Sequence, residues 1–387
     1  MKILHFNHCG FNAGGVEAYI ADVSRALAAA GHECRLLSFA AEDTSQLMPG
    51  AVSVGATQTK LVLANIQREI ADFRPDVAYI HAVYEPEIAR WVADQLPTVA
   101  YVHSPYLICP GYAQFLRRSR RICPHPASPN CLLLAQTERC CFGRNPLGHR
   151  RRLRQVRAFV TIYQHLSILV GSRFMQELLQ RNKLSKERTN VLAPFLIPAP
   201  PPEATAITSY DTIVYAGRLT PEKGLPCLVR ALSLVPRRWR LLVAGDGPGR
   251  AECERLAADL GIGARISFLG WLAGPKLAQV YGDSSFLVVP SLWPEPFGRV
   301  GPEAATYGRA TVAFDVGGVS DWLVDGITGY LVPPSDISLL SERITSLLGS
   351  PAQQVEMGRQ ARTLALDKWS SAKHVDGLVK HLLAARS

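Results

Sequence analysis

The chain has no run of about 18 or more consecutive apolar residues, so we expect no helix that spans a membrane. Its first residues, Met1 to Phe6, contain no long apolar stretch and no small-residue cleavage site. They predict the first buried strand of a cytoplasmic protein and not a secretory signal. Hydrophobic residues make up 48% of the 387 residues and charged residues only 19%, which excludes disorder as the main state. A chain of this length predicts two domains.

Basic residues are concentrated in one segment. Residues 109–157 contain 11 arginines against one acidic residue, Glu138, an excess that equals the whole net charge of +10. The remainder of the chain is therefore neutral. A single basic insert on a balanced scaffold predicts a docking surface for an anionic partner.

Short apolar runs, glycine-rich loops and amphipathic stretches alternate along the chain, and the alternation restarts after a proline-rich linker at 196–211. The expected strands are 2–7, 34–39, 76–81, 98–103, 167–171, 189–193, 213–216, 240–244, 265–269, 285–289, 310–314 and 329–332. This pattern predicts an α/β fold with two Rossmann-like, doubly wound domains facing across a cleft, where the carboxyl ends of the strands bind ligands. We expect an N-terminal domain at 1–200 and a C-terminal domain at 201–364. At 365–387 we expect a helix, or a pair of helices, that packs back on the N-terminal domain.

Several loops that follow the strands of the second half contain residues suited to binding a nucleotide. Glu295 and Glu303 lie eight positions apart, the first in a Pro/Gly-rich loop and the second where a helix would begin. They could accept hydrogen bonds from sugar and ribose hydroxyls, or they could be a loop charge and a helix N-terminal acid. Arg218 and Lys223 lie on a glycine-bounded loop that could bind a pyrophosphate. Further glycine loops follow at 243–249, 268–271, 315–321 and 325–336, and together they favour the binding interpretation.

With these motifs, the sequence resembles a family 4 retaining glycosyltransferase of the GT-B fold. The resemblance covers nearly the whole chain and is most specific in residues 213–336, while Gly14-Gly15-Val16-Glu17 matches the N-terminal pattern. It implies transfer of a sugar from a nucleotide-sugar donor to a saccharide or lipid-linked acceptor. The expected setting is the synthesis of a cell-surface polysaccharide or glycolipid.

The resemblance also implies roles for individual residues. Arg218 and Lys223 match the cations that hold the donor pyrophosphate, Glu295 the acid beside the donor sugar, and Glu303 the acid that binds the ribose. The loop positions that touch sugar and phosphate are matched by Phe297, Gly298, Gly14 and Gly15. His103 matches the histidine of the sugar pocket, although a structural role is its alternative. Ala310 and Asp321 stand where the family usually has proline and glutamate.

The chain contains no Asp-x-Asp motif, which many transferases use to hold a metal ion. We therefore expect a donor site that requires no metal or other cofactor, with Arg218 and Lys223 stabilising the departing phosphate. The resemblance implies front-face attack with retention, in which that phosphate helps to deprotonate the acceptor. Glu295 is then a residue that positions the sugar and not a nucleophile.

Five of the nine cysteines lie in the basic insert, and the other four read as small core residues. A structural zinc ion at Cys109, Cys123, Cys131 and Cys140, or at three of them with His125, is one interpretation. Disulfides and free thiols are the alternatives, and the spacing contains no Cys-x(2)-Cys pair.

The arginines between Arg117 and Arg157 have several candidate partners. An anionic membrane surface at the inner face of the membrane and a lipid-linked diphosphate acceptor are two, and a solvated face is the alternative. Nucleic acid is disfavoured because no aromatic interleaving accompanies the arginines. Two rival functions stay open, namely a catalytically silent nucleotide-sugar-binding partner of another transferase and a nucleic-acid-binding protein. The sugar, the base, the acceptor, the linkage and the oligomeric state cannot be read from the sequence.

Overall fold

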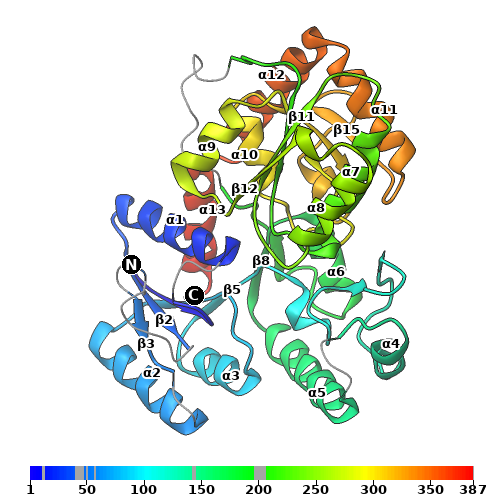
Figure 1. The fold of residues 1–387 in the computed structure, drawn as a ribbon. Coiled ribbons are helices and arrows are strands. Elements are labelled where there is room, and N and C mark those ends of the chain that lie inside the picture. Colours follow the sequence, from blue (N-terminus) through cyan, green and yellow to red (C-terminus); the bar gives the residue numbers. More distant parts are fainter. Residues whose placement is uncertain are drawn as a thin grey trace. The chain divides into compact units, whose positions relative to one another are not determined.

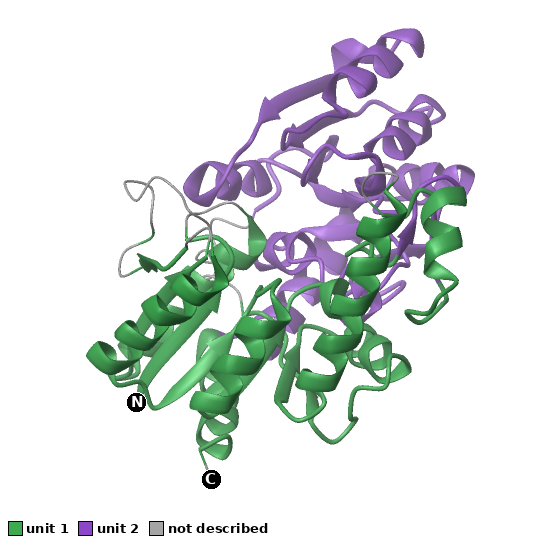
Figure 2. Cartoon of the chain, turned by 90° about the horizontal axis from the view of Figure 1, so that it is seen from below, with its two compact units in different colours: residues 1–114, 124–195, 371–387 green, residues 115–123, 196–370 purple. Residues whose placement is uncertain are grey.

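Two sheets of parallel strands organise the chain (Figure 1). The structure is a computed structural model that describes residues 1–10, 14–39, 48, 51–55, 58–141, 145–195 and 206–386. It divides into two compact units, drawn in green and purple in Figure 2. Unit 1 holds residues 1–114, 124–195 and 371–387, and unit 2 holds residues 115–123 and 196–370. The expected boundary at residue 200 and most of the expected linker lie outside the described residues.

The sheet of unit 1 has seven strands in the order β3-β2-β1-β4-β5-β8-β9, and all of its pairs are parallel. The strands are β1 (Lys2–Asn7), β2 (Glu33–Ser38), β3 (Ala51–Ser53), β4 (Val77–Ile80), β5 (Thr98–Val102), β8 (Ser167–Val170) and β9 (Thr189–Val191). The helices are α1 (Gly15–Ala29), α2 (Thr59–Phe73), α3 (Pro86–Gln95), η2 (Pro105–Leu107), α4 (Cys131–Thr137), α5 (Pro146–Tyr163), α6 (Arg173–Arg181) and α13 (Ser371–Ala384). Every residue of β4 and β5 is buried, as expected for parallel strands covered on both faces.

The sheet of unit 2 has six parallel strands in the order β12-β11-β10-β13-β14-β15. They are β10 (Thr212–Ala216), β11 (Arg240–Ala244), β12 (Ile266–Gly270), β13 (Phe286–Val289), β14 (Ala310–Phe314) and β15 (Gly329–Val332). The helices are η4 (Pro221–Lys223), α7 (Leu225–Ser233), α8 (Arg250–Asp259), η5 (Gly263–Arg265), α9 (Gly274–Gly282), α10 (Val300–Thr306), η6 (Val319–Asp321), α11 (Ile337–Leu348) and α12 (Pro351–Lys368). Ala310, where the family usually has proline, is the fully buried first residue of β14, and Asp321 ends η6.

Both sheets reverse their strand order once, at β1/β4 in unit 1 and at β10/β13 in unit 2. The predicted α/β class with two doubly wound sheets is therefore confirmed. In such sheets ligands bind beyond the carboxyl ends of the strands at the point of reversal. The loops after β10 and β13, and those after β1 and β4, are therefore the places where a ligand is expected to bind.

The carboxyl-terminal segment at 365–387 contains parts of two helices. Residues 365–368 are the end of α12 in unit 2, and α13 belongs to unit 1. Trp369 lies between the two helices, and the centre of its buried ring is 5.8 Å from that of Phe297, which also belongs to unit 2. In unit 1, α13 adds Val375, Leu378 and Leu382 to a core that also contains Tyr19 and Val99.

The basic insert is also divided, although we expected all of it in the N-terminal domain. Residues 115–123 group with unit 2 and contain a two-stranded antiparallel hairpin, β6 (Phe115–Leu116) and β7 (Arg121–Ile122). Arg144, one of its arginines, lies outside the described residues. Among the described helices, none is long and apolar enough to cross a membrane.

Candidate functional site

The loops that follow β10 and β13 meet at the reversal point of the second sheet. The backbone N–H of Leu292 donates to the carbonyl of Glu222 at 2.9 Å. Gly224 has a φ of +71°, and a Cβ atom there would lie 1.8 Å from the carbonyl oxygen of Pro290. Only glycine fits so close an approach. The two loops are therefore held together by their backbones, independently of the side chains that they carry.

Lys223 and Glu295 form a buried ion pair across these loops. The distance from Nζ to Oε1 is 2.6 Å, and the exposed fractions of the two side chains are 18% and 7%. The Lys223 ammonium also lies 4.7 Å from the centre of the Trp293 ring. Burial raises the pKa of Glu295, but the charge of Lys223 and the hydrogen bond from its ammonium group outweigh it. The pKa of Glu295 therefore lies below its ordinary value, and the carboxylate is charged at neutral pH.

Hydrogen bonds from a glycine and a tryptophan hold the loop that carries Glu295. The N–H of Gly318 donates to the carbonyl of Glu295 at 2.7 Å, and the indole N–H of Trp322 donates to the carbonyl of Phe297. Gly298 adopts a φ of +83°, which favours glycine. The Phe297 ring is buried.

The remaining two predicted donor residues of unit 2 lie on the same edge of the sheet. Arg218 follows β10, its carbonyl accepts a hydrogen bond from the Tyr215 hydroxyl at 3.1 Å, and its side chain is exposed. Glu303 lies in the first turn of α10, where Arg299 Nε is 3.3 Å from Glu303 Oε1. Both side chains thus end at the edge where a doubly wound sheet binds ligands.

In unit 1, the loop after β1 leads into a glycine-rich start of α1. Asn7 donates to Glu17 Oε1 at 3.1 Å and accepts from the backbone N–H of Ala82 at 3.2 Å, which ties the ends of β1 and β4 together. A Cβ atom at Gly15 would meet no atom within 4 Å. Packing among the described residues therefore does not require a glycine at this position.

His103 lies directly after β5 and is half-buried. Its Nε2 is 3.1 Å from Nδ1 of His81, and its ring is 4.5 Å from that of Tyr101. Sequence reasoning missed His81, although each of the two histidines is the last residue of an expected strand. Adjacent parallel strands bring such residues together, and that signal was available.

Two family descriptions between them match most of the chain. Residues 202–364 match "Glycosyl transferases group 1", and residues 13–196 match "Glycosyltransferase Family 4". The chain belongs to the family 4 glycosyltransferases.

Individual members of the family give partial matches in sequence and a full match in fold. Alpha-D-kanosaminyltransferase of Streptomyces kanamyceticus is 31% identical over 169 residues, which are 43% of this chain and 44% of that protein. D-inositol 3-phosphate glycosyltransferase of Nocardia farcinica is 35% identical over 184 residues, 45% of this chain and 40% of that protein. The chain thus matches less than half the length of either curated relative. The crystal structure of Anabaena HepE in complex with UDP has a TM-score of 0.76 at 18% identity and covers 99% of this chain and 100% of that one. This likeness shows the GT-B fold.

We expected all the arginines between residues 150 and 154 of the basic insert to face solvent. One of them does not. Arg150, Arg151, Arg154 and Arg157 are exposed on α5, but Arg152 is buried. Its guanidinium donates to the carbonyl of Tyr106 at 2.7 Å and lies 3.9 Å from the centre of the Tyr112 ring. Arg152 therefore links α5 to the segment after β5, and its buried side chain is not available to an anionic partner.

The cysteines of the insert do not form a recognisable metal site. In the described part of the chain, no group of three or more His, Cys, Asp or Glu side chains could hold a metal ion. Of the four predicted zinc ligands, Cys109, Cys131 and Cys140 belong to unit 1 and Cys123 to unit 2. None of these four described cysteines forms a disulfide in the structure. The zinc interpretation stays a prediction.

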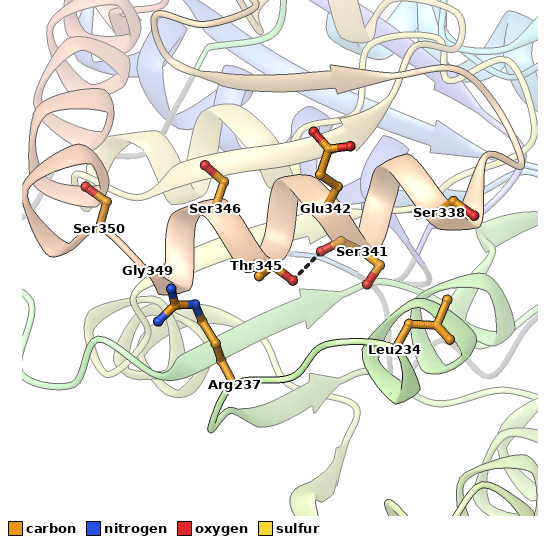
Figure 3. Close-up of a pocket in the computed structure, with 9 residues that line it drawn as sticks. All are labelled: Leu234, Arg237, Ser338, Ser341, Glu342, Thr345, Ser346, Gly349 and Ser350. Atoms are coloured by element: carbon orange, nitrogen blue, oxygen red, sulfur yellow. Dashed lines mark hydrogen bonds between the residues drawn. The ribbon is translucent and has the colours of Figure 1, made fainter.

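An open groove of about 600 Å³ lies elsewhere in unit 2 (Figure 3). Leu234 and Arg237 line one side, and residues of α11 from Ser338 to Thr345 line the other. Because residues 234–237 lead into the amino end of β11, the groove lies at the sheet edge opposite the Lys223–Glu295 pair. It takes no part in the candidate site.

Proposed function

We propose that the chain transfers a sugar from a nucleotide-sugar donor to a saccharide or lipid-linked acceptor, with retention of the anomeric configuration. The observation that carries the proposal is the buried Lys223–Glu295 pair at the reversal point of a Rossmann-ordered sheet. A buried charge pair is costly to maintain, and such perturbed groups gather at functional sites. Membership of the family and the HepE complexes with UDP and UDP-glucose support it.

In this proposal each charged group acts on a different part of the donor. Lys223 and the exposed Arg218 bind the pyrophosphate and stabilise the charge that grows on it as the sugar leaves. Glu295 accepts hydrogen bonds from the sugar hydroxyls, because Lys223 keeps it ionised. Glu303 takes the ribose diol. The backbone N–H groups at Phe297 and Gly298, and those at Gly14 and Gly15, approach the sugar and the phosphates.

The chemistry needs no metal ion in this scheme. Two cationic side chains and backbone N–H groups supply the positive charge, and the departing phosphate takes the acceptor's proton from the same face. Front-face attack accounts for retention without a covalent intermediate. We place this reaction in the synthesis of a cell-surface polysaccharide or glycolipid at the cytoplasmic side of the membrane.

We further propose that α4 and α5 contact an anionic membrane, where a lipid-linked acceptor would lie. Leu133 on α4 and Leu147 on α5 are large apolar residues with exposed fractions of 66% and 72%. The two helices pack together, with Gln136 and His149 3.4 Å apart. Exposed leucines beside four exposed arginines combine the apolar and the basic contacts that interfacial helices use. Nucleic acid offers no partner for the leucines.

The decisive experiment combines binding with product analysis. Titration calorimetry with UDP, GDP and their sugars should identify one nucleotide that binds, in the presence and in the absence of EDTA. Incubation of that donor with lipid extracts should then yield a glycoside whose anomeric configuration, measured by NMR, equals that of the donor. Binding without transfer to any acceptor would favour a silent nucleotide-sugar-binding partner, and an inverted product would contradict the retaining mechanism.

A further inference from the structure

Three histidines form a row across the sheet of unit 1. His5 lies in β1, His81 directly after β4 and His103 directly after β5, and these strands are neighbours in the sheet. Nδ1 of His5 is 3.1 Å from Nε2 of His81, and Nδ1 of His81 is 3.1 Å from Nε2 of His103. His5 and His81 are fully buried and His103 is half-buried. The row therefore connects the interior of unit 1 to the carboxyl edge of its sheet.

Burial keeps the two inner rings uncharged. It lowers the pKa of His5 to about 3. Burial and, to a smaller extent, the charges of His103 and His5 hold the pKa of His81 well below its ordinary value. A neutral imidazole has one N–H donor and one acceptor nitrogen. Because both nitrogens of His81 are engaged, its two hydrogen bonds must run in the same direction, either outward from His5 or inward from His103.

The inner end of the row distinguishes the two directions. Nε2 of His5 is buried and has no hydrogen-bond partner. If the bonds ran inward, His5 would carry its proton on Nε2, as a buried N–H without an acceptor. If they run outward, that nitrogen keeps only an unused lone pair. Buried N–H groups without a partner are rarer in native proteins than acceptors that lack one, so the outward direction is favoured. A charged His103 would also force the inward direction, at the same cost.

We infer that His5 and His81 are positioning residues that hold the proton of His103 on Nδ1, which makes this nitrogen a hydrogen-bond donor and not a general base. Its importance for sugar transfer rests on the proposed function. A donor nitrogen binds a hydroxyl oxygen but takes no proton from it. This agrees with a reaction in which the departing phosphate accepts the proton of the acceptor.

The tautomer can be measured directly on the full chain. Long-range ¹H–¹⁵N correlation NMR at pH 7.5 distinguishes the two neutral tautomers and the charged ring, and comparison with a His103→Gln variant assigns the signal. We expect His103 to be neutral with its proton on Nδ1. A proton on Nε2, or a charged ring, would overturn the inference. The measurement needs no donor, so its failure is distinguishable from a failure to bind a nucleotide-sugar.

Variants of His81 test whether the row sets this tautomer. His81→Leu removes the donor to His103, so the Nδ1 tautomer should lose its preference and kcat should fall about fivefold, the factor that one net hydrogen bond is worth. His81→Asn places an amide N–H near the former Nδ1 and should retain the tautomer and most of kcat. His381→Leu, at a half-buried histidine of α13 outside the row, is the matched control and should change neither. An unchanged His103 tautomer in His81→Leu would contradict the role of His81. If that variant does not fold, the His103 tautomer measured in the parent still tests the inference.

Discussion

At the scale of single residues, the Lys223–Glu295 pair raises a question of cost. Two charges withdrawn from water lose solvation, which their attraction does not always repay, and an apolar pair of similar volume is often as stable. Two backbone contacts already join the two loops: the hydrogen bond from Leu292 to Glu222, and the close approach of Gly224 to Pro290. The pair is therefore unnecessary for loop closure, and its residue types are better explained by a ligand that needs a carboxylate and an ammonium group.

Removing the lysine should expose that cost. In Lys223→Met the Glu295 carboxylate stays buried without its cation, and we expect a loss of about 3–5 kcal/mol in the free energy of unfolding at pH 8. In the parent, the lowered pKa of Glu295 stabilises the fold above the ordinary value of 4.5, and this contribution is lost as the pH falls through the folded pKa. In the variant, burial dominates and raises that pKa, so the deficit should shrink between pH 8 and pH 5.

Urea unfolding at several pH values checks both expectations. The double variant Lys223→Met/Glu295→Gln buries no charge at this place, so it should recover most of the stability while remaining inactive. If Lys223→Met were as stable as the parent at pH 8, the buried carboxylate would have found another cation or water.

Glu303 offers a separate test of the nucleotide site. Glu303→Ala removes the charged acceptor proposed for the ribose diol, and a hydrogen bond to a charged group contributes about 1.5–3 kcal/mol. Nucleotide binding should weaken roughly 10- to 150-fold in calorimetry. Glu252→Ala is the matched control, because Glu252 is an exposed acid in the first turn of α8. Equal affinities of the two variants would exclude the ribose assignment.

Sequence patterns identified these residues but not their contacts. The glycine loops indicated Lys223 and Glu295 separately, yet 72 positions separate them, and only the strand order places them together. Trp293 and Trp322 were missed because a tryptophan in a loop carries no periodic signal. The support that they give to the carboxylate loop follows from tertiary packing.

At the scale of elements, α5 shows what charge counting overlooks. Its buried residues follow a helical stripe through His149, Arg152, Val156, Phe159 and Tyr163. Composition placed Arg152 among the surface arginines, whereas its phase on the helix assigns it to the buried face. The strands were easier to predict because a buried parallel strand is a short apolar run. β3 was missed because its three residues carry too little pattern.

The exposed arginines of α5 should anchor the chain to anionic membranes. Replacing Arg150, Arg151, Arg154 and Arg157 by glutamine removes four charges, each contributing about 1 kcal/mol near an anionic surface. We expect sedimentation with phosphatidylserine liposomes to be lost, and parental binding to fall with salt.

Two controls accompany that experiment. Replacing four exposed arginines of unit 2, Arg230, Arg237, Arg238 and Arg240, removes the same charge and should leave sedimentation intact. Arg152→Gln should lower stability instead, because it leaves the Tyr106 carbonyl without its donor. If both quadruple variants lose binding equally, the attraction is a property of net charge and not of α5.

At the scale of the whole molecule, the chain leaves unit 1 after Phe195 and returns to it at Ser371. Each unit has its own sheet and its own buried core, so the two should unfold as separate transitions. The returning helix α13 is tied to unit 1 by His374, whose Nδ1 donates to the carbonyl of Ala193 at 2.8 Å. Nε2 of a neutral His374 then accepts from the Tyr19 hydroxyl at 2.9 Å.

A single substitution in α13 should therefore act on one transition only. Leu378 is fully buried in the core of unit 1, so Leu378→Ala should cost about 3 kcal/mol and lower the midpoint of that transition by roughly 6–12 °C. The donor is held mainly by unit 2 in our proposal. At a hundredfold excess over its dissociation constant, the donor should add about 2.7 kcal/mol to the free energy of unfolding. This gain should appear chiefly in the transition of unit 2. Differential scanning calorimetry of parent and variant, each with and without the nucleotide, measures all four combinations. Because α12 and α13 are consecutive, coupled units would show one transition that both changes shift, and that result would refute the independence of the two cores.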